Sequence, residues 1–273
     1  MKTLIEKANV LNEALPYIRK FYGKTFVIKY GGAAMVEEKL KDIFAQDIVL
    51  LNFIGIKPVI IHGGGPMINE IMKKMGKKPT FIHGQRVTDK ETIDIVEMVL
   101  GGLINKEIVA LINSHGGRAI GLSGKDGSLI NAKKKVVKKL SADTGASEII
   151  DLGLVGEVEK INPSIILSIQ KDGFIPVIAP IGAGHKNETL NINADYVAGA
   201  VAAALKAEKL ILLTDTKGIM DENKKLISTL NKTKIKSLVS KNIISGGMLP
   251  KVQACQNAIA GGVKKTHIID GRI

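Results

Sequence analysis

The sequence is poor in the residues that build disulfide scaffolds and nucleic-acid stacking platforms. Among 273 residues there is one cysteine, no tryptophan, and an aromatic content of only 4%. A single cysteine, Cys255, excludes an intramolecular disulfide and a cysteine-based metal site. Proteins that bind single-stranded nucleic acid stack bases on aromatic rings beside basic groups, and no basic run here is interleaved with Phe or Tyr. We therefore expect no nucleic-acid partner.

Long uninterrupted apolar runs are also absent. A membrane-spanning helix needs roughly 18 or more apolar residues, and the best candidates are interrupted at Lys57, Pro58 and Lys206. The first 20 residues lack the continuous apolar core of a signal peptide. These features predict a cytoplasmic protein with no membrane association.

The charge balance is strongly basic. Thirty-nine Lys and Arg residues against 26 Asp and Glu residues give a net charge of +13, while 45% of residues are hydrophobic. That composition is typical of a globular protein with a sizeable core, in one large domain or two closely joined ones. Most lysines occur in scattered pairs, which indicates that they are solvated on the surface. The net positive charge is also compatible with a small anionic substrate.

Helical and strand-like segments alternate along the chain. A capping box at Thr3 and Glu6 predicts an amphipathic helix that ends before Gly23. Strands are expected at 25–30, 58–65, 118–124, 174–182, 209–215 and 266–271, and helices at about 36–53, 66–75, 90–112, 163–171, 194–207, 233–239 and 249–260. Between them, β-rich stretches at 128–139 and 153–161 suggest hairpins that decorate the sheet, and a further hairpin is expected near 221–224.

Several of these strands are apolar throughout, without polar alternation, which predicts burial on both faces. The expected fold class is α/β: a three-layer αβα sandwich around a mostly parallel open sheet. No linker of Pro or Ser divides the sequence, so two lobes would share one continuous sheet.

Four strands run directly into glycine-rich loops, at 27–32, 59–65, 121–127 and 212–218. One such loop is usually only a tight turn. Four at the carboxyl edge of one sheet, each able to expose backbone N–H groups, predict a site for a polyanion. The loop at 121–127 is not a Walker A motif, because Asp126 stands where a Ser or Thr would bind Mg²⁺ and the spacing is too short.

Seven motifs occur in an order and spacing that resemble the N-acetylglutamate kinases of the amino-acid kinase family. They are VIKYGG (27–32), IIHGGGP (60–66), GQRVTD (84–89), GLSGKDG (121–127), NINAD (191–195), LLTDTKGI (212–219) and GGMLPK (246–251). The resemblance covers essentially the whole chain from Thr25 and implies the amino-acid kinase fold. It also implies phosphorylation of the γ-carboxylate of N-acetyl-L-glutamate by ATP, the second step of arginine biosynthesis. Alternatives are another carboxylate, carbamate or UMP kinase of this family, or a non-catalytic regulatory module that binds anions.

The resemblance also implies roles for individual residues. Lys29 and Lys251 match the lysines that flank the transferred phosphoryl group, and Asp195 matches the carboxylate that holds both ammonium groups. The implied substrate-binding residues are Gly64 and Gly65 around the reacting carboxylate, Arg86 on the α-carboxylate, and Asn191. The implied nucleotide-binding residues are Gly31, Gly32, Thr214, Asp215, Lys217, Gly218 and Met248. Mg²⁺ is expected to enter with ATP, with few or no direct protein ligands.

The expected organisation has an oligomerisation helix at 1–22, an acetylglutamate-binding N-lobe at 23–190 and an ATP-binding C-lobe at 191–273. The N-terminal helix resembles the extension of the arginine-sensitive, hexameric members, which predicts a homohexamer built as a trimer of dimers. A PII-type signalling protein is a candidate partner. The arginine-sensitive relatives continue beyond the position of Ile273, so we expect weak or absent inhibition by arginine.

Overall fold

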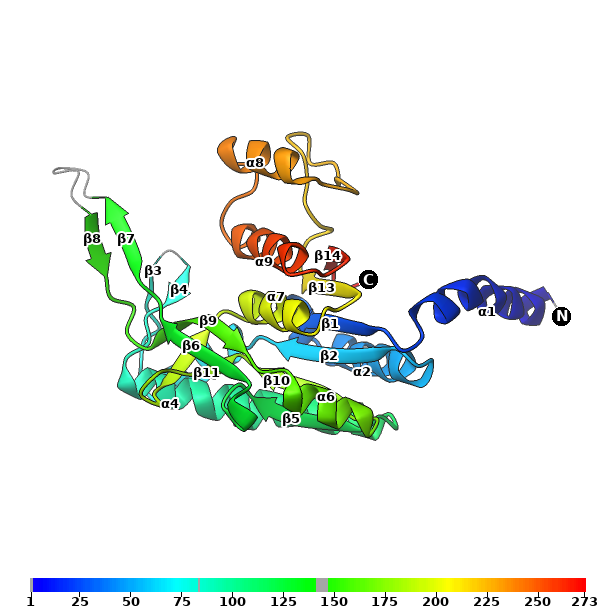
Figure 1. The fold of residues 1–273 in the computed structure, drawn as a ribbon, viewed down its shortest axis with the longest axis horizontal. Coiled ribbons are helices and arrows are strands. Elements are labelled where there is room, and N and C mark those ends of the chain that lie inside the picture. Colours follow the sequence, from blue (N-terminus) through cyan, green and yellow to red (C-terminus); the bar gives the residue numbers. More distant parts are fainter. Residues whose placement is uncertain (1, 83, 141–146) are drawn as a thin grey trace.

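A six-stranded parallel sheet forms the centre of the protein, in a computed structural model that describes residues 2–82, 84–140 and 147–273 (Figure 1). The strand order is β14-β13-β1-β2-β10-β5, and each neighbouring pair is parallel. The strands are β1 (Thr25–Tyr30), β2 (Lys57–His62), β5 (Ala119–Ser123), β10 (Ile175–Ala179), β13 (Lys209–Thr214) and β14 (Lys265–Asp270). The mostly parallel sheet expected from the apolar strands is confirmed.

Successive side chains of the central strands enter two different cores, because side chains in a strand alternate between the faces of the sheet. Ile28 and Ile60 pack into one core, and their neighbours Val27 and Val59 pack into the other. The first core lies under α2 (Glu38–Phe53), α3 (Gly65–Lys74), α4 (Lys90–Glu97) and α5 (Asn105–Ser114). The second lies under α6 (Ser164–Lys171), α7 (Ala194–Ala204) and α9 (Met248–Ala260). The αβα sandwich is therefore confirmed.

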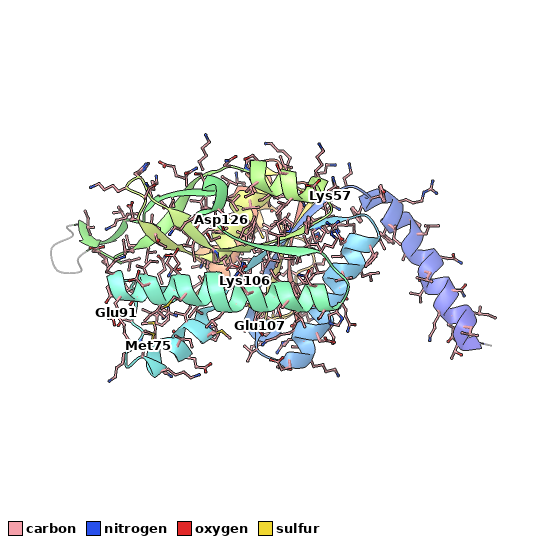
Figure 2. The ribbon with its side chains drawn as sticks, turned by 90° about the horizontal axis from the view of Figure 1, so that it is seen from below. Lys57, Met75, Glu91, Lys106, Glu107 and Asp126 are labelled. Atoms are coloured by element: carbon pink, nitrogen blue, oxygen red, sulfur yellow. The ribbon has the colours of Figure 1, made fainter. Side chains whose placement is uncertain are left out.

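The long helix expected at 90–112 differs from a regular α-helix in its middle. Figure 2 shows it crossing one face of the molecule, with Glu91 toward one end and Glu107 farther along. Residues Met98–Ile104 form a π-helical segment between α4 and α5. Gly101 and Gly102 lie inside this segment, and both face open space.

The middle section forms a small closed barrel rather than simple hairpins. Its four strands are β6 (Ile130–Lys134), β9 (Val155–Ile161), β11 (Ile181–Ala183) and β12 (Thr189–Ile192). The strand expected at 174–182 breaks at Pro180, so that β10 stays in the parallel sheet while β11 enters the barrel. Proline cannot donate to a strand ladder, which explains why the switch falls there.

Shorter elements complete the chain. They are the strands β3 (Phe81–Ile82), β4 (Gln85–Arg86), β7 (Val137–Leu140) and β8 (Ser147–Ile150), the 3-10 turns η1 (Gly32–Met35) and η3 (Asp126–Ser128), and the helix α8 (Lys232–Ser240). The hairpin expected near 221–224 consists of a tight turn with an isolated bridge between Met220 and Leu226.

The N-terminal helix α1 (Lys2–Phe21) extends away from the sandwich (Figure 1). The predicted helix is confirmed, and its apolar side chains Leu4, Leu11 and Leu15 are exposed in the isolated chain. Across the described residues, no helix is long and apolar enough to cross a membrane.

Candidate active site

Two lysines from distant parts of the sequence meet one carboxylate beyond the carboxyl edge of the sheet. Lys29 lies near the end of β1, Asp195 in the first turn of α7, and Lys251 in the first turns of α9. The Nζ of Lys29 is 3.3 Å from Oδ1 of Asp195, and the Nζ of Lys251 is 2.8 Å from Oδ2. The three residues that the resemblance marks as catalytic therefore form one cluster.

The cluster carries one net positive charge in a mostly buried place. The Lys29 and Asp195 side chains are only 10% and 6% exposed. Burial lowers the pKa of Lys29. The negative charge of Asp195 raises this pKa, and the positive charge of Lys251 lowers it further. A second anion placed between the two ammonium groups would relieve this imbalance, so the cluster is suited to attract negative charge.

Asp195 is oriented by the start of its helix. Its backbone N–H donates to Oδ1 of Asn193, the N-cap of α7, at 2.9 Å. Asn is a preferred N-cap because its side-chain oxygen satisfies an unpaired N–H of the first turn. Sequence reasoning passed over Asn193, although an Asn directly before a helical segment is the signal that identifies such a cap.

The loop after β1 approaches the cluster through glycines. A Cβ at Gly31 would collide with the Nζ of Lys29, and a Cβ at Gly32 would collide with the carboxylate of Asp215. Gly32 also has φ of +74°, a conformation that costs other residues free energy. Gly32 therefore requires glycine, a side chain at Gly31 would displace the Lys29 ammonium group, and the loop brings the candidate residue Asp215 beside the start of η1.

The loop after β2 leads into the N-terminus of α3. Gly64 packs against Leu100 and Ile104, where a Cβ would overlap both side chains, whereas Gly65 faces open space. Lys29, Gly31, Gly32, Gly64 and Gly65 line one cavity of about 450 Å³. Free N–H groups at a helix N-terminus favour anions, so this cavity joins backbone donors with the charge of Lys29.

Arg86 is a buried cation without an acidic partner among the described residues. Its guanidinium donates to Oδ1 of Asn69 at 2.6 Å and to the carbonyl of Gly65 at 3.3 Å, and it stacks on the Phe81 ring at 4.8 Å. Burial lowers the pKa of Arg86. An anionic ligand would compensate this charge.

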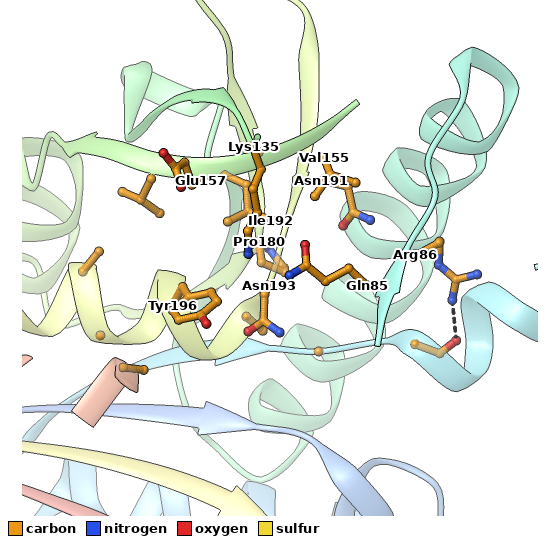
Figure 3. Close-up of a pocket in the computed structure, with 18 of the residues that line it drawn as sticks. Gln85, Arg86, Lys135, Val155, Glu157, Pro180, Asn191, Ile192, Asn193 and Tyr196 are labelled. Carbon is orange, nitrogen blue, oxygen red and sulfur yellow. Dashed lines mark hydrogen bonds between the residues drawn. The ribbon is translucent and has the colours of Figure 1, made fainter. Parts of the chain in front are cut away.

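A second cavity, of about 750 Å³, contains Arg86 and Asn191 and is also bordered by Gly64 and Gly65 (Figure 3). The Nδ2 of Asn191 donates to Oγ1 of Thr88 at 3.4 Å. The four candidate substrate residues thus border one space, with Lys29 in the adjoining cavity.

The larger cavity includes residues that sequence reasoning missed. Lys135 lies above the Tyr196 ring at 5.3 Å, and the Tyr196 hydroxyl donates to Oε1 of Gln253 at 3.1 Å. Glu157 lines the same wall (Figure 3). Lys135 belongs to the lysine-rich stretch at 133–139, where no sequence pattern separates a cavity residue from a solvated one.

Apart from Gly31 and Gly32, the candidate nucleotide residues lie around the end of β13 and the start of α9, and none of them lines either cavity. Thr214 ends β13, and its carbonyl accepts the N–H of Gly271. Gly218 is buried with φ of +133°, and Met248 begins α9 and packs near Leu238. Lys217 is exposed. Asp215 alone is brought into contact with a phosphate-loop candidate, Gly32, and the nucleotide roles stay predictions.

Within the residues that the structure describes, no group of three or more His, Cys, Asp or Glu side chains is arranged to hold a metal ion. The carboxylate of Asp195 is already engaged by two lysines. A divalent ion at this site would therefore take its ligands mainly from a bound anion and water, which suits Mg²⁺.

Comparison with known proteins agrees with this geometry. The profile of the Amino acid kinase family matches residues 24–270, and the chain belongs to that family. It is 58% identical to the Acetylglutamate kinase of Syntrophus aciditrophicus over 98% of this chain and 90% of the relative. It is 54% identical to the Acetylglutamate kinase of Geobacter sp. over 100% of this chain and 93% of the relative.

Among solved structures, the chain is similar to an N-acetylglutamate synthase from Neisseria gonorrhoeae in complex with coenzyme A and N-acetyl-glutamate. The TM-score is 0.79 at 25% identity, and the match covers 96% of this chain and 57% of that one.

Proposed function

We propose that this member of the amino acid kinase family transfers the γ-phosphoryl group of ATP to the γ-carboxylate of N-acetyl-L-glutamate. The product is N-acetyl-L-glutamyl 5-phosphate, and the step is the second of arginine biosynthesis. The observation that carries the proposal is the cluster of Lys29, Asp195 and Lys251 beside two glycine loops. The relatives named Acetylglutamate kinase, 54–58% identical, support this substrate.

Phosphoryl transfer to a carboxylate mainly requires that the protein position the two reacting groups and neutralise their negative charge. A carboxylate oxygen attacks the γ-phosphorus while the bond from that phosphorus to the β–γ bridging oxygen breaks, and ADP leaves with the electron pair. The attacking carboxylate is already ionised, so no general base is required. Negative charge spreads over the equatorial oxygens in the transition state, where Lys29 and Lys251 would stabilise it.

Asp195 would hold the ammonium groups of Lys29 and Lys251 in separate positions beside the transferred phosphoryl group. Its oxygens contact one lysine each, so both side chains are placed before substrates bind. Preorganised charges of this kind need little rearrangement during the reaction.

Substrate recognition is assigned to the two cavities that Gly64 and Gly65 both border. Gly64 and Gly65 would donate N–H groups to the reacting carboxylate. Arg86 would pair with the α-carboxylate, because a planar guanidinium matches two oxygens, and Asn191 would orient the same molecule.

Nucleotide binding is assigned to the opposite side of the cluster. Gly31 and Gly32 would contact the phosphates, and the adenosine would lie near Thr214, Asp215, Lys217, Gly218 and Met248. Mg²⁺ bound with ATP would supply charge neutralisation at the phosphates. On this basis residues 23–190 form the acetylglutamate-binding lobe and 191–273 the ATP-binding lobe, joined by the pairing of β1 with β13.

We further propose a cytoplasmic homohexamer, assembled as a trimer of dimers through α1 (residues 1–22). The exposed Leu4, Leu11 and Leu15 support this assembly, because an apolar helix stripe is stabilised by burial against a partner. A PII-type signalling protein is a candidate partner.

The deciding experiment measures ADP release with acetylglutamate, glutamate, aspartate, carbamate and UMP side by side. Turnover with acetylglutamate that exceeds the others is the expected result. Preference for another acceptor would reassign the substrate within the family, and absence of turnover with all five would favour a non-catalytic module.

A further inference from the structure

His62 is completely buried directly before the glycine loop, and both ring nitrogens have partners. Its Nδ1 lies 2.8 Å from the carbonyl oxygen of Gly63, and its Nε2 lies 3.2 Å from Nδ2 of Asn105. A carbonyl oxygen can only accept and an amide NH₂ can only donate. The ring is therefore the neutral tautomer with its proton on Nδ1. Burial lowers the pKa of His62 to about 4, in agreement with a neutral ring.

Asn105 is fixed as firmly as the histidine that it contacts. It is 1% exposed, and its Nδ2 also lies 2.9 Å from the carbonyl of Val177 in β10. Its Oδ1 accepts from Nζ of Lys106 at 3.1 Å. The amide orientation follows from these contacts, because the nitrogen faces acceptors and the oxygen faces a cation.

The π-helical segment places Asn105 against the loop. Asn105 follows directly after Met98–Ile104, and two residues of that segment, Leu100 and Ile104, pack against Gly64. One element thus supports the loop with apolar side chains under Gly64 and with a polar side chain behind His62. π-Helical turns occur frequently at functional sites, where they shift side chains relative to a regular helix.

These contacts fix the peptide group that joins Gly63 to Gly64. The N–H of Gly63 donates to the carbonyl of Tyr30 in β1 at 2.8 Å, and its own carbonyl accepts from His62. A trans peptide is planar, with its C=O and N–H on opposite sides. With the carbonyl turned toward the buried ring, the N–H of Gly64 must point away from it, and it has no backbone acceptor among the described residues.

We propose that His62 is a positioning residue that orients the Gly64 N–H toward the reacting carboxylate of the substrate, and that Asn105 fixes the tautomer of its ring. The assignment rests on the proposed function, because it concerns the anion that the loop receives. His62 acts through the Gly63 carbonyl, and Asn105 acts through His62. Glycine-rich loops have little stiffness of their own, so a donor in such a loop gains from external support.

The competing explanation is that His62 only satisfies polar groups of the core. Two substitutions separate the explanations, since asparagine places an amide nitrogen near the Nδ1 position and glutamine reaches the Nε2 position. His62→Asn would keep the donor to Gly63. His62→Gln would keep the contact with Asn105 and remove the donor to Gly63.

The experiment compares kcat, both KM values and thermal stability for the two variants, with Gln170→Leu as the control. Gln170 is a buried polar residue on α6, away from the loop. We expect His62→Asn to retain kcat within about threefold and His62→Gln to lose about 10- to 100-fold in kcat, with the KM for ATP little changed. Gln170→Leu should shift stability alone.

Equal losses of kcat in both His62 variants, in proportion to their losses of stability, would overturn the proposal. Nitrogen NMR of the wild-type ring gives a second test that needs no activity and no folded variant. A proton on Nδ1 is the expected result, and a proton on Nε2 would overturn it. A wild-type protein that shows the Nδ1 tautomer but does not phosphorylate acetylglutamate would contradict the proposed function instead.

Discussion

Lys251 and Asp195, 56 positions apart in the sequence, are joined by a hydrogen bond of 2.8 Å from Nζ to Oδ2. Each lies near the N-terminus of its own helix, α9 and α7. The helices pack together in the core below the sheet edge, where Ala198 and Ala254 belong to one cluster. That packing sets the distance between the two charged groups.

Lys29→Ala and Lys251→Ala should each reduce kcat by about 10²- to 10³-fold, because their charge is needed most in the transition state. ATP binding, measured by calorimetry, should weaken far less. Lys264→Ala is the matched control, since the exposed Lys264 side chain also pairs with one carboxylate, that of Glu208, at 2.9 Å. Unchanged turnover in either cluster variant would remove the catalytic assignment.

Arg86→Ala should raise the KM for acetylglutamate about 10- to 100-fold, the effect of losing a charged, forked hydrogen bond of roughly 1.5–3 kcal/mol. The KM for ATP should stay nearly constant. Arg118→Ala serves as the control, because Arg118 also stacks on a phenylalanine, Phe174, at 4.1 Å. Equal shifts of both KM values would show that Arg86 is structural.

Gly32→Ala should reduce both stability and turnover, whereas Gly23→Ala should reduce stability alone. Both glycines have positive φ, +74° and +72°, and each substitution costs about 1 kcal/mol from backbone strain. At Gly32 the new methyl group would also displace the Asp215 carboxylate, while the space at Gly23 is open. Chemical denaturation and steady-state kinetics on both variants test the difference. Normal kcat in Gly32→Ala would exclude a strict role for this loop.

The free energy of unfolding should fall as the pH drops from 6.5 toward 4, in part because of His62. Its pKa is about 4 in the folded protein, lowered by burial and by the nearby charge of Lys106, and 6.5 when unfolded. The unfolded state therefore binds the extra proton first as the pH falls. The shift corresponds to about 3 kcal/mol over this interval. Urea denaturation at several pH values should show a flatter dependence for His62→Gln, and the same slope in both proteins would contradict the burial of a neutral ring.

The full chain should be a hexamer by size-exclusion chromatography with light scattering, and a shortened chain that begins at Gly23 should be a dimer. The reason is that the exposed apolar stripe of α1 requires a partner surface. The same number of subunits in the assemblies of both chains would refute the role of the helix.

The sequence by itself determined the strands of the central sheet and the edge of that sheet at which the candidate site lies. Apolar runs such as 27–30 and 59–61 can be stable only where both faces of a sheet are covered, and the glycines after them mark the ends of strands. The carboxyl ends of parallel strands lie at one edge of a sheet, so the sequence alone predicts that the glycine loops lie close together. The motifs around Lys29, Asp195 and Lys251 carried the family resemblance through local spacing alone.

Only the tertiary structure decided which side chains meet. Three contacts join residues from different elements. They are the hydrogen bond from Arg86 to Asn69, the close approach of Gly32 to the Asp215 carboxylate, and the hydrogen bond from Asn105 to His62. Regular periodicity also predicts one strand at 174–182 and one helix at 90–112, so that the entry of β11 into the barrel and the π-helical segment became visible only in the structure. Side-chain periodicity determines which face is buried, whereas distances between separate elements depend on how whole layers pack.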